Sequence, residues 1–332
     1  MPEPENSEAL PDGSEVLEVV VPALMDAMRI DRALATITGM SRSEICRVIE
    51  SGAVMVDGTV VSKVSTPLFE GTRLEAVLPP LDDGTVTPDA SVLIRVLYED
   101  EDVVVVDKLA EQVVHPGAGN KGATLVAGLL ARYPDIADLA ERGFSEANRP
   151  GIVHRLDKGT SGLLMVARTP RAMESLSEQL ADRSATRRYV GVVEGLLESD
   201  RGVVDAPISR SASLPTKMAV RSDGREARTG YEVLTRLAKP QRSVVGLSLE
   251  TGRTHQIRVH MAAIGNPIVN DGRYGKKTER SLDALRLALH AGRLEFNHPG
   301  DGRRIQVVSP WPSDLKALGG AEEAQVFLDR KV

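Results

Sequence analysis

Near the start of the chain, hydrophobic residues recur first at the spacing of a helix and then at the alternate positions of a strand. Apolar side chains recur at helical spacing over residues 30–37 and again over residues 45–49, as on the buried face of an amphipathic helix. Ser41 begins a capping box before the second stripe. Beyond it, valines at alternate positions lead into Asp57-Gly58, a dipeptide typical of hairpin turns. The pattern predicts helix, helix, hairpin and a further strand.

Strand-like apolar runs dominate the rest of the chain. The β-branched run at residues 103–106 is the clearest, and others recur around residues 190–193, 231–234 and 244–249. A helix is indicated after Thr169, which has the features of an N-cap followed by Pro at the first helical position. Because strands dominate and helices are scattered, we expect an α+β fold with a mostly antiparallel mixed sheet rather than a doubly wound one.

These elements divide the chain into five predicted segments. The start of the chain is rich in Pro, Glu and Ser, a composition that favours disorder. A turn-rich stretch opens at Pro79-Pro80. The predicted segments are a disordered acidic tail (1–14), a small unit (15–78), a linker (79–90), a large domain (91–318) and a C-terminal tail (319–332).

Composition sets limits on the class of protein. With 332 residues, 42% of them hydrophobic and 27% charged, the chain has the make-up of a globular protein. No apolar run approaches the roughly 20 residues of a membrane span, and the first residues lack the pattern of a signal peptide. The single cysteine, Cys46, excludes an internal disulfide and a multi-cysteine metal site. We therefore expect a cytoplasmic protein without membrane contact, and a monomer by default.

The net charge of −6 argues at first against a nucleic-acid partner. However, residues 1–20 hold six acidic residues and no Lys or Arg, and without them 41 acidic residues balance 41 basic ones. Local basic patches can then decide binding. The small unit carries such residues, which would also suit ordinary solvated helix faces: Arg29, Arg32, Arg42, Arg47 and Lys63.

A carboxylate stands at the edge of an apolar segment in residues 151–168. An apolar lead-in, a polar loop and a continuous apolar run suggest strand, loop and buried strand. The loop would hold Asp157 between Arg155 and Lys158. A carboxylate there costs several kcal/mol to desolvate unless it is paired. The residue types alone leave open a surface ion pair or a functional carboxylate.

Polar and apolar residues alternate between Gln256 and His260. On a strand, Gln256, Arg258 and His260 would share one face, and the residues between them would point into the core. Histidines at this spacing could suggest a metal site, but arginines accompany them and no carboxylate or cysteine cluster does. Neither a P-loop nor a serine-hydrolase elbow is present in the sequence. We expect no metal and no cofactor.

Four blocks of the large domain resemble the RluA/RluD-type pseudouridine synthases. The block at residues 107–117 comes first, residues 154–164 match the family motif H-R-L-D-x-x-T-S-G-L-L, and the blocks at residues 188–195 and 251–260 follow in the family's order. The segment that ends at Asp271 and residues 287–291 match two further family segments. The small unit resembles the αL-type (S-four-like) RNA-binding domain that many such enzymes carry at the N-terminus. Matching positions include Arg32, Ser41, Arg42, Gly52 and Gly58.

The resemblance implies isomerisation of uridine to pseudouridine in RNA, without a cofactor, in a central cleft. It makes Asp157 the catalytic carboxylate, Arg258 its ion-pair partner and Tyr189 the ring that stacks on the uracil. Whether Asp157 attacks the sugar, attacks the ring or removes a sugar proton stays open. The resemblance also gives RNA- or base-binding roles to Arg155, Leu289, Arg253, His255, Gln256, Arg32 and Arg42.

The order of domains favours large-subunit ribosomal RNA as the partner, since many relatives with this order act on it. The same reaction on transfer RNA is the first alternative, and a non-catalytic RNA-binding or ribosome-assembly factor is the second. A third alternative is a hydrolase that uses His154 or His255 with Ser161.

Overall fold

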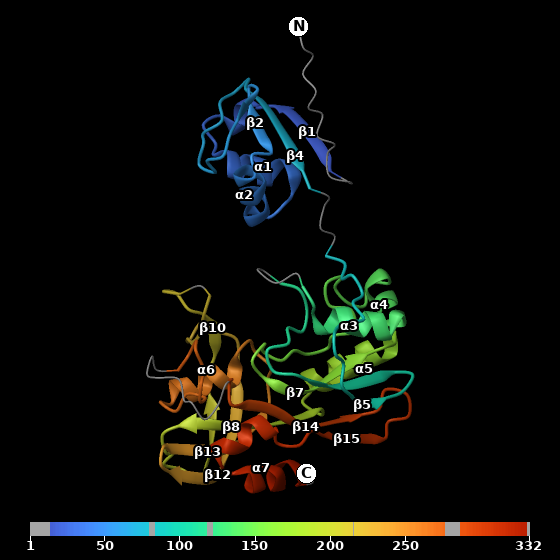
Figure 1. The fold of residues 1–332 in the computed structure, drawn as a ribbon, viewed down its shortest axis with the longest axis vertical. Coiled ribbons are helices and arrows are strands. Elements are labelled where there is room, and N and C mark those ends of the chain that lie inside the picture. Colours follow the sequence, from blue (N-terminus) through green and yellow to red (C-terminus); the bar gives the residue numbers. More distant parts are fainter. Residues whose placement is uncertain (1–13, 80–83, 118–121, 215, 276–285, 331–332) are drawn as a thin grey trace. The chain divides into compact units, whose positions relative to one another are not determined.

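A computed structural model describes residues 14–79, 84–117, 122–214, 216–275 and 286–330 of the chain. The chain divides into two compact units, residues 1–83 and 84–332 (Figure 1). Almost all of the predicted acidic tail (1–14), and residues 80–83 of the predicted linker, lie outside the described residues.

The first unit packs two helices against a four-stranded antiparallel sheet. Its elements are β1 (Glu15–Val20), a 3-10 turn η1 (Ala23–Met25), α1 (Ile30–Thr38), α2 (Arg42–Glu50), β2 (Val54–Val56), β3 (Thr59–Val60) and β4 (Arg73–Leu78). The strands lie in the order β1-β4-β2-β3. Both predicted helices, the capping box at Ser41 and the hairpin at Asp57-Gly58 are present. Sequence patterning missed β1, because Val16 and Val20 are exposed beside the core-facing Leu17 and Val19, so apolar and polar residues do not alternate along this edge strand.

The second unit is built on a nine-stranded mixed sheet. The path of the sheet is β5-β6-β7-β14-β8-β13-β12-β9, and β15 also pairs with β14. Only β7 and β14 run parallel, so the expected mostly antiparallel mixed sheet is present. The strands are β5 (Val96–Glu99), β6 (Val103–Lys108), β7 (Ser161–Ala167), β8 (Thr186–Glu194), β9 (Arg201–Asp205), β12 (Arg228–Ala238), β13 (Gln241–Leu249), β14 (Leu289–Asn297) and β15 (Arg304–Val308), with a separate hairpin of β10 (Ile208–Arg210) and β11 (Met218–Val220).

Helices cover both faces of this sheet. They are α3 (Leu125–Arg132), η2 (Pro134–Ile136), α4 (Ala137–Glu141), α5 (Pro170–Ala181), α6 (Gln256–Ala263), η3 (Ser313–Leu318) and α7 (Ala321–Asp329). The N-cap at Thr169 begins α5 as the sequence indicates. Within the described ranges, no helix combines the length and the apolar character that a membrane span needs.

The predicted C-terminal tail (319–332) is wrong for most of its length. Helix α7 packs against β8, β12, β13 and β14 and buries Phe327 and Leu328. Leu328 and Phe327 fill the space above Gly292 and Gly246, where a Cβ atom would lie within 2.6 Å of them. Its exposed Val326 blurs the apolar stripe, which explains why the pattern did not reveal this helix.

Candidate active site

A short loop before β7 carries Asp157 to the middle of the sheet. The amide of Thr160 donates to the carbonyl oxygen of Asp157 at 3.0 Å, which closes the loop into a turn. Gly162 then begins the parallel pairing with Ala291 at φ +112°, and a Cβ there would lie 2.2 Å from the Ala291 carbonyl oxygen. Only glycine therefore permits the close approach of β7 to β14 directly after the loop.

The buried Lys108 fastens the Asp157 loop from beneath. Its ammonium group donates to the carbonyl oxygens of Leu109, Gln112 and Lys158 at 2.8, 2.9 and 3.1 Å. Burial lowers the pKa of Lys108 to about 7, against the opposing charge of Asp157. Lys108 thus ties the end of β6 to the residue that follows Asp157.

Asp157 pairs with a distant arginine and not with its chain neighbours. Arg258 donates from Nη1 to Asp157 Oδ2 at 3.0 Å, and the Asp157 side chain is 15% exposed. The sequence suggested Arg155 and Lys158 as flanking cations, but Arg155 is exposed and Lys158 lies 3.7 Å from Glu111. The apolar lead-in is also no strand, since Ile152 forms only an isolated bridge to Val166.

Arg258 is shared between two carboxylates. Its Nε and Nη2 donate to Asp271 at 2.7 and 2.8 Å, while its Nη1 donates to Asp157. Burial disfavours the charge, but Asp271 and Asp157 outweigh it and raise the pKa of Arg258. The Asp271 side chain is fully buried and also accepts from the amides of Arg273 and Tyr274 at 3.0 Å. This arrangement fixes the Arg258 guanidinium beside Asp157.

The segment that carries Arg258 is a helix, which corrects the predicted strand. In α6, Gln256 and His260 are four residues apart and both contact Thr229 of β12, at 3.0 and 2.9 Å. Arg258 points away from them toward Asp157. The helix is buried on nearly all sides, so its sequence lacks an amphipathic period. The alternation of polar and apolar residues from Gln256 to His260 therefore led to the wrong prediction of a strand. Gly265, at φ +88° just after its end, is the local signal of a helix terminus.

His255 lies at the start of α6 beside the Asp157–Arg258 pair. Its Nε2 is 3.9 Å from Asp157 Oδ1, too long for a hydrogen bond, and its Nδ1 is 2.7 Å from the Tyr274 hydroxyl. Burial lowers the pKa of His255, with the Asp157 charge opposing and that of Arg258 adding to the shift. The imidazole is therefore neutral near pH 7.

Tyr189 and Leu289 lie on neighbouring strands at the same site. Both are buried, and Leu289 pairs with Gly191, which stands two residues from Tyr189 on the same face of β8. A Cβ on Gly191 would lie 3.3 Å from Leu289 Cδ1, so the leucine covers that position. Burial raises the pKa of Tyr189, with the charge of Arg187 opposing and that of Asp157 adding to the shift. The phenol thus stays protonated at neutral pH.

The other predicted RNA-binding residues of the large domain differ in how free they are. Gln256 is buried and its amide contacts Thr251, the Arg253 backbone, the Arg228 carbonyl and Thr229, which leaves it no capacity for a base. Arg253 is half-buried and donates from Nε to the Glu226 carbonyl at 2.8 Å. Arg155 is exposed, and no hydrogen bond or ion pair of its side chain is found in the described part of the chain.

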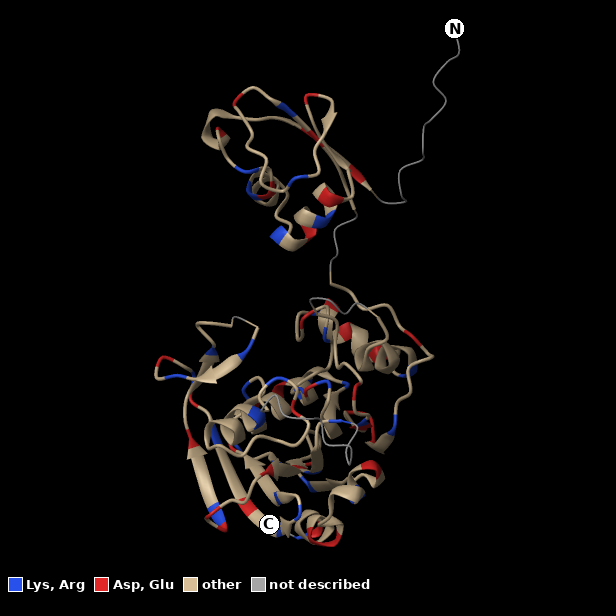
Figure 2. Cartoon of the chain, turned by 60° about the vertical axis from the view of Figure 1, so that its left-hand side comes forward, with Lys and Arg blue, Asp and Glu red and all other residues tan. Residues whose placement is uncertain are grey.

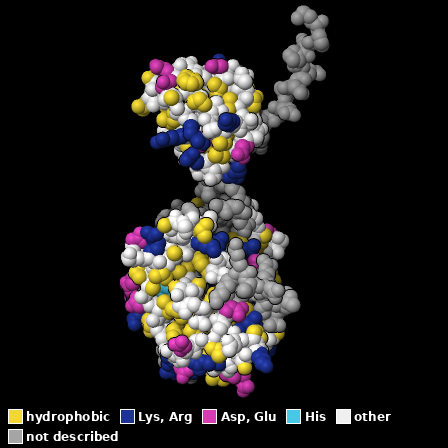
Figure 3. All heavy atoms as spheres, turned by 90° about the vertical axis from the view of Figure 1, so that its left-hand side faces the viewer, with side chains coloured by type: hydrophobic (Ala, Val, Ile, Leu, Met, Phe, Trp, Pro, Cys, Tyr) yellow, Lys and Arg dark blue, Asp and Glu magenta, His cyan; other side chains and the backbone are white. Residues whose placement is uncertain are grey.

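The basic residues of the small unit are exposed on α1 and α2. Arg32 and Arg42 are both exposed. Figure 2 marks the Lys and Arg positions along the ribbon, and Figure 3 shows Lys and Arg side chains gathered on one face of this unit. Arg42 and Arg29 converge on the buried Asp31, at 2.6 and 3.0 Å. Asp31 therefore orients two of the exposed guanidinium groups.

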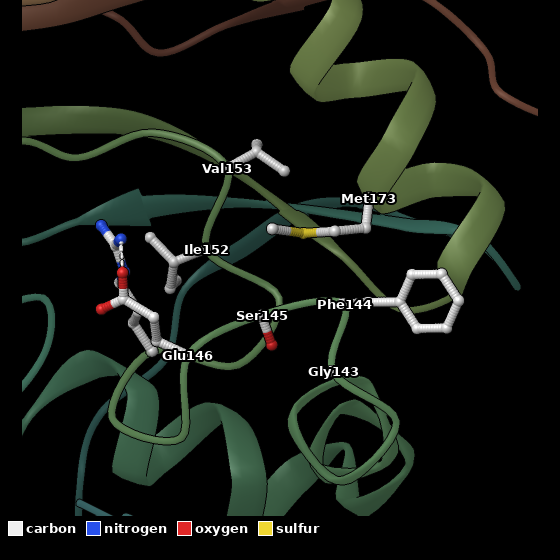
Figure 4. A pocket seen from close by; sticks show the side chains of 8 residues that line it. Gly143, Phe144, Ser145, Glu146, Ile152, Val153 and Met173 are labelled. Carbon is white, nitrogen blue, oxygen red and sulfur yellow. Dashed lines mark hydrogen bonds and ion pairs between the residues drawn. The ribbon is translucent and has the colours of Figure 1, made fainter.

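Asp157 lines neither of two cavities found among the described residues of the large unit. One, of about 440 Å³, lies where Met173 reaches from α5 toward Ile152, with Phe144 and Ser145 beside it (Figure 4). The other, of about 260 Å³, is lined by residues that include Tyr231, Glu232 and Phe327. The central cleft over Asp157 remains a prediction.

The geometry does not support the hydrolase or metal alternatives. Ser161 Oγ lies 2.9 Å from Nδ1 of the buried His290, and neither His154 nor His255 contacts it. Both nitrogens of His260 are engaged, by Thr229 and the Ala206 carbonyl. Among the residues that the structure describes, no group of three or more His, Cys, Asp or Glu side chains is placed to hold a metal.

Sequence reasoning missed three residues of this neighbourhood: Asp271, Lys108 and Arg187. Asp271 and Lys108 stand in stretches that resemble the family, but nothing in the local pattern indicated their contacts. Arg187 precedes Tyr189 by two residues, so their shared strand face was a usable signal.

Known proteins resemble the chain over most of its length. The family model for RNA pseudouridylate synthase matches residues 102–263. The chain is 41% identical to an uncharacterized RNA pseudouridine synthase of Bacillus subtilis, over 87% of this chain and 92% of the relative. It is 42% identical to the ribosomal large subunit pseudouridine synthase D of Xanthomonas campestris, over 94% of each. Among solved structures, human RNA pseudouridylate synthase domain containing 1 matches with a TM-score of 0.53 and 29% identity, over 68% of this chain and 86% of that one.

Proposed function

Because the chain belongs to the RNA pseudouridine synthase family, we propose that it isomerises uridines of large-subunit ribosomal RNA with Asp157 as the catalytic carboxylate. The contact that carries the proposal is the 3.0 Å ion pair between Asp157 and Arg258. A partly exposed carboxylate held by a fixed guanidinium is oriented by the protein and can still reach a substrate. The relative named ribosomal large subunit pseudouridine synthase D supports the choice of RNA.

The reaction breaks the bond from the ribose to ring nitrogen 1, turns the uracil and joins carbon 5 to the sugar. Asp157 takes part as an anion, whether as a nucleophile or as a base. Arg258 positions it and compensates its charge. His255, neutral and 3.9 Å from Asp157, borders the place where the uracil turns.

Tyr189 and Leu289 supply the apolar walls for the uracil in this proposal. The raised pKa of the buried Tyr189 favours a stacking role over a role as a base, because a protonated phenol does not accept a proton from carbon 5. Arg155, exposed three residues after Ile152 and two before Asp157, is free to occupy the gap that an everted nucleotide leaves. Eversion costs least in a loop or bulge.

The first unit is proposed to be an S-four-like RNA-binding domain. Its exposed arginines on α1 and α2, with Arg32 and Arg42 among them, would contact phosphates and add a salt-dependent share of the affinity. A monomeric, cytoplasmic enzyme completes the proposal. The same reaction on transfer RNA and a non-catalytic role in ribosome assembly remain the competing functions.

The test is a map of pseudouridines in cells with and without this gene. We expect at least one pseudouridine of the large-subunit ribosomal RNA to disappear on deletion and to return when the gene is restored. If pseudouridines disappeared from transfer RNA alone, transfer RNA would be the target instead. If the map were unchanged in both RNAs, the proposed function would be rejected. The matched control is restoration with the Asp135→Asn gene, which alters a partly exposed ion pair with Arg168 that takes no part in the proposed site.

A further inference from the structure

Arg187 is a buried arginine without an acceptor. The residue is 8% exposed, and its Nε is enclosed with no hydrogen-bond partner. In the described ranges, no carboxylate, carbonyl or hydroxyl oxygen pairs with its guanidinium. Burial lowers the pKa of Arg187, which reflects the cost of an uncompensated charge inside the protein.

The neighbouring strand provides a direct contrast. Arg293 of β14 is 4% exposed, and its guanidinium donates to Glu295 at 2.6 Å, the Leu328 carbonyl at 2.8 Å and Gln306 at 3.2 Å. This is how a structural arginine is accommodated at such depth. Arg187 lacks every one of these kinds of partner, so packing alone does not account for it.

The position of Arg187 links it to the proposed uracil site. Residues Arg187 and Tyr189 share one face of β8, about 7 Å apart along the strand, and they interact electrostatically. Arg188 points to the opposite face, where it donates to the Arg330 carbonyl at 2.6 Å. The charge of Arg187 therefore lies on the substrate side of the sheet.

Among the described residues, no hydrogen-bond acceptor is found for the Arg187 guanidinium, and one neighbouring group is a hydrogen-bond donor. A Cβ on the exposed Gly252 would lie 2.9 Å from Arg187 Nη1, so the guanidinium ends just beneath this turn. The charge of Arg187 also acts on His154. His154 accepts the Met165 amide at Nε2, so its Nδ1 carries the proton and finds no partner. A cation without a counter-charge, next to a hydrogen-bond donor without an acceptor, forms a site that suits an anion.

We propose that Arg187 anchors an anion subsite that takes a phosphate of the RNA strand, adjoining the uridine held at Tyr189. The subsite rests on the proposed function for the position of the base. A two-residue step of strand is similar in length to the ribose that separates a base from its phosphate. A guanidinium can hold phosphate oxygens in bidentate fashion, and the closeness of Arg187 Nη1 to the exposed Gly252 places the guanidinium near the protein surface.

The decisive variant is Arg187→Met, which keeps the length and apolar packing but removes the charge. RNA binding is measured as a function of salt, with large-subunit ribosomal RNA from cells that lack the gene as the probe. We expect the slope of log affinity against log salt to fall by about 0.7, the value for one phosphate contact on a single strand. At fixed salt the affinity should fall about tenfold, which corresponds to about 1.4 kcal/mol.

Thermal unfolding separates this role from a structural one. Because Arg187 is an unpaired buried charge, Arg187→Met should raise the melting temperature. The matched control Arg293→Met should lower it, since Glu295 loses its partner, and should leave the salt slope unchanged. Arg187→Lys keeps the charge and should keep the slope.

Three results would overturn the subsite. The first is a salt slope of Arg187→Met equal to that of the unaltered protein. The second is an unchanged slope with a shifted pH profile of turnover, which would assign Arg187 to the tuning of Tyr189. The third is stabilisation by inorganic phosphate that Arg187→Met abolishes without any change in the RNA slope, which would make it a free-phosphate site. The salt slope and the stabilisation by phosphate do not depend on pseudouridine formation, so a negative result in either one rejects the subsite and leaves the proposed function standing, whereas failure of the unaltered protein to bind this RNA would reject the proposed function itself.

Discussion

The Arg258 guanidinium donates hydrogen bonds to two carboxylates, one fully buried and one partly exposed. Asp271 is fully buried and takes two of the donors, and Asp157 takes the third while keeping 15% of its side chain exposed. Asp271 accepts two backbone amides as well, so it is the fixed point and Asp157 is the part that a substrate can reach. Asp271 is thus a positioning residue for the proposed chemistry.

Asp271→Asn should weaken both the fold and the reaction. Removal of one charge from a buried pair lowers the free energy of unfolding by about 3 kcal/mol. A less firmly held Arg258 should reduce kcat roughly 10- to 100-fold and leave KM unchanged, because Asp271 is enclosed by protein. Urea unfolding and steady-state pseudouridine formation measure the two effects.

The matched control is Asp135→Asn, which removes a carboxylate from a partly exposed pair with Arg168. It should cost less than about 1 kcal/mol and leave kcat unaltered. Equal kcat values for Asp271→Asn and the unaltered protein would remove Asp271 from the support of Arg258.

The residues at the site could be predicted only in part. The family resemblance gave the Asp157–Arg258 contact, although 101 positions separate the two residues. Asp271 and Lys108 matched family segments, but their contacts could not be predicted. The pairing of Asp271 with Arg258, 13 positions away, and of Lys108 with the carbonyl of Lys158, 50 positions away, leaves no local period in the sequence. Arg187 was within reach of strand periodicity, but an unpaired buried charge is visible only when its surroundings are known.

At the scale of elements, one carboxylate joins the two helices of the first unit. Asp31, in the first turn of α1, accepts from Arg29 at 3.0 Å and from Arg42 of α2 at 2.6 Å. The hydrogen bonds from Arg29, opposed by burial and aided by Arg42, lower the pKa of Asp31 to about 2. Asp31 thereby holds α1 to α2 and orients the arginines proposed to meet RNA.

This pair should make the first unit sensitive to acid. A carboxylate whose folded pKa is below its unfolded value stabilises the fold above the unfolded pKa, and this stabilisation is lost as the pH falls from about 4 to about 2. Asp31→Asn should cost about 2 kcal/mol at neutral pH and lose most of that pH dependence. Urea unfolding followed through the amide resonances of α1 and α2 measures both.

Glu50→Gln, an exposed change on α2, serves as the control and should alter neither quantity. An acid dependence of Asp31→Asn identical to that of the unaltered chain would show that the Asp31 pair does not join the helices.

Whether a helix or strand could be predicted from the sequence depended on how much of its surface is buried. Helices α1 and α2 have one buried face, and the sequence located both. Helix α6 is buried nearly all round and was mistaken for a strand, and β1 is too exposed to show a pattern. Amphipathic contrast, and not element length, separates the successes from the errors.

At the scale of the whole molecule, the helices proposed to meet RNA belong to one compact unit, and the sheet that carries the Asp157 site belongs to the other. The mixed sheet brings β7, β8 and β14 together, so residues 157, 189 and 289 meet although they are far apart in sequence. The sequence indicated the fold class and the strands β6, β7, β8, β12 and β13, but not β5, β9, β14 and β15. The strand order, and the one parallel pair among the described strands, arise from long-range pairing that no local pattern encodes.

The central claim is that the Asp157 carboxylate performs the isomerisation. The most direct measurement follows tritium released from carbon 5 of labelled large-subunit ribosomal RNA, with the purified full-length protein and its Asp157→Asn variant. We predict steady release by the unaltered protein, none by Asp157→Asn, and equal affinity of both for the RNA. Release by Asp157→Asn at the rate of the unaltered protein would contradict the account.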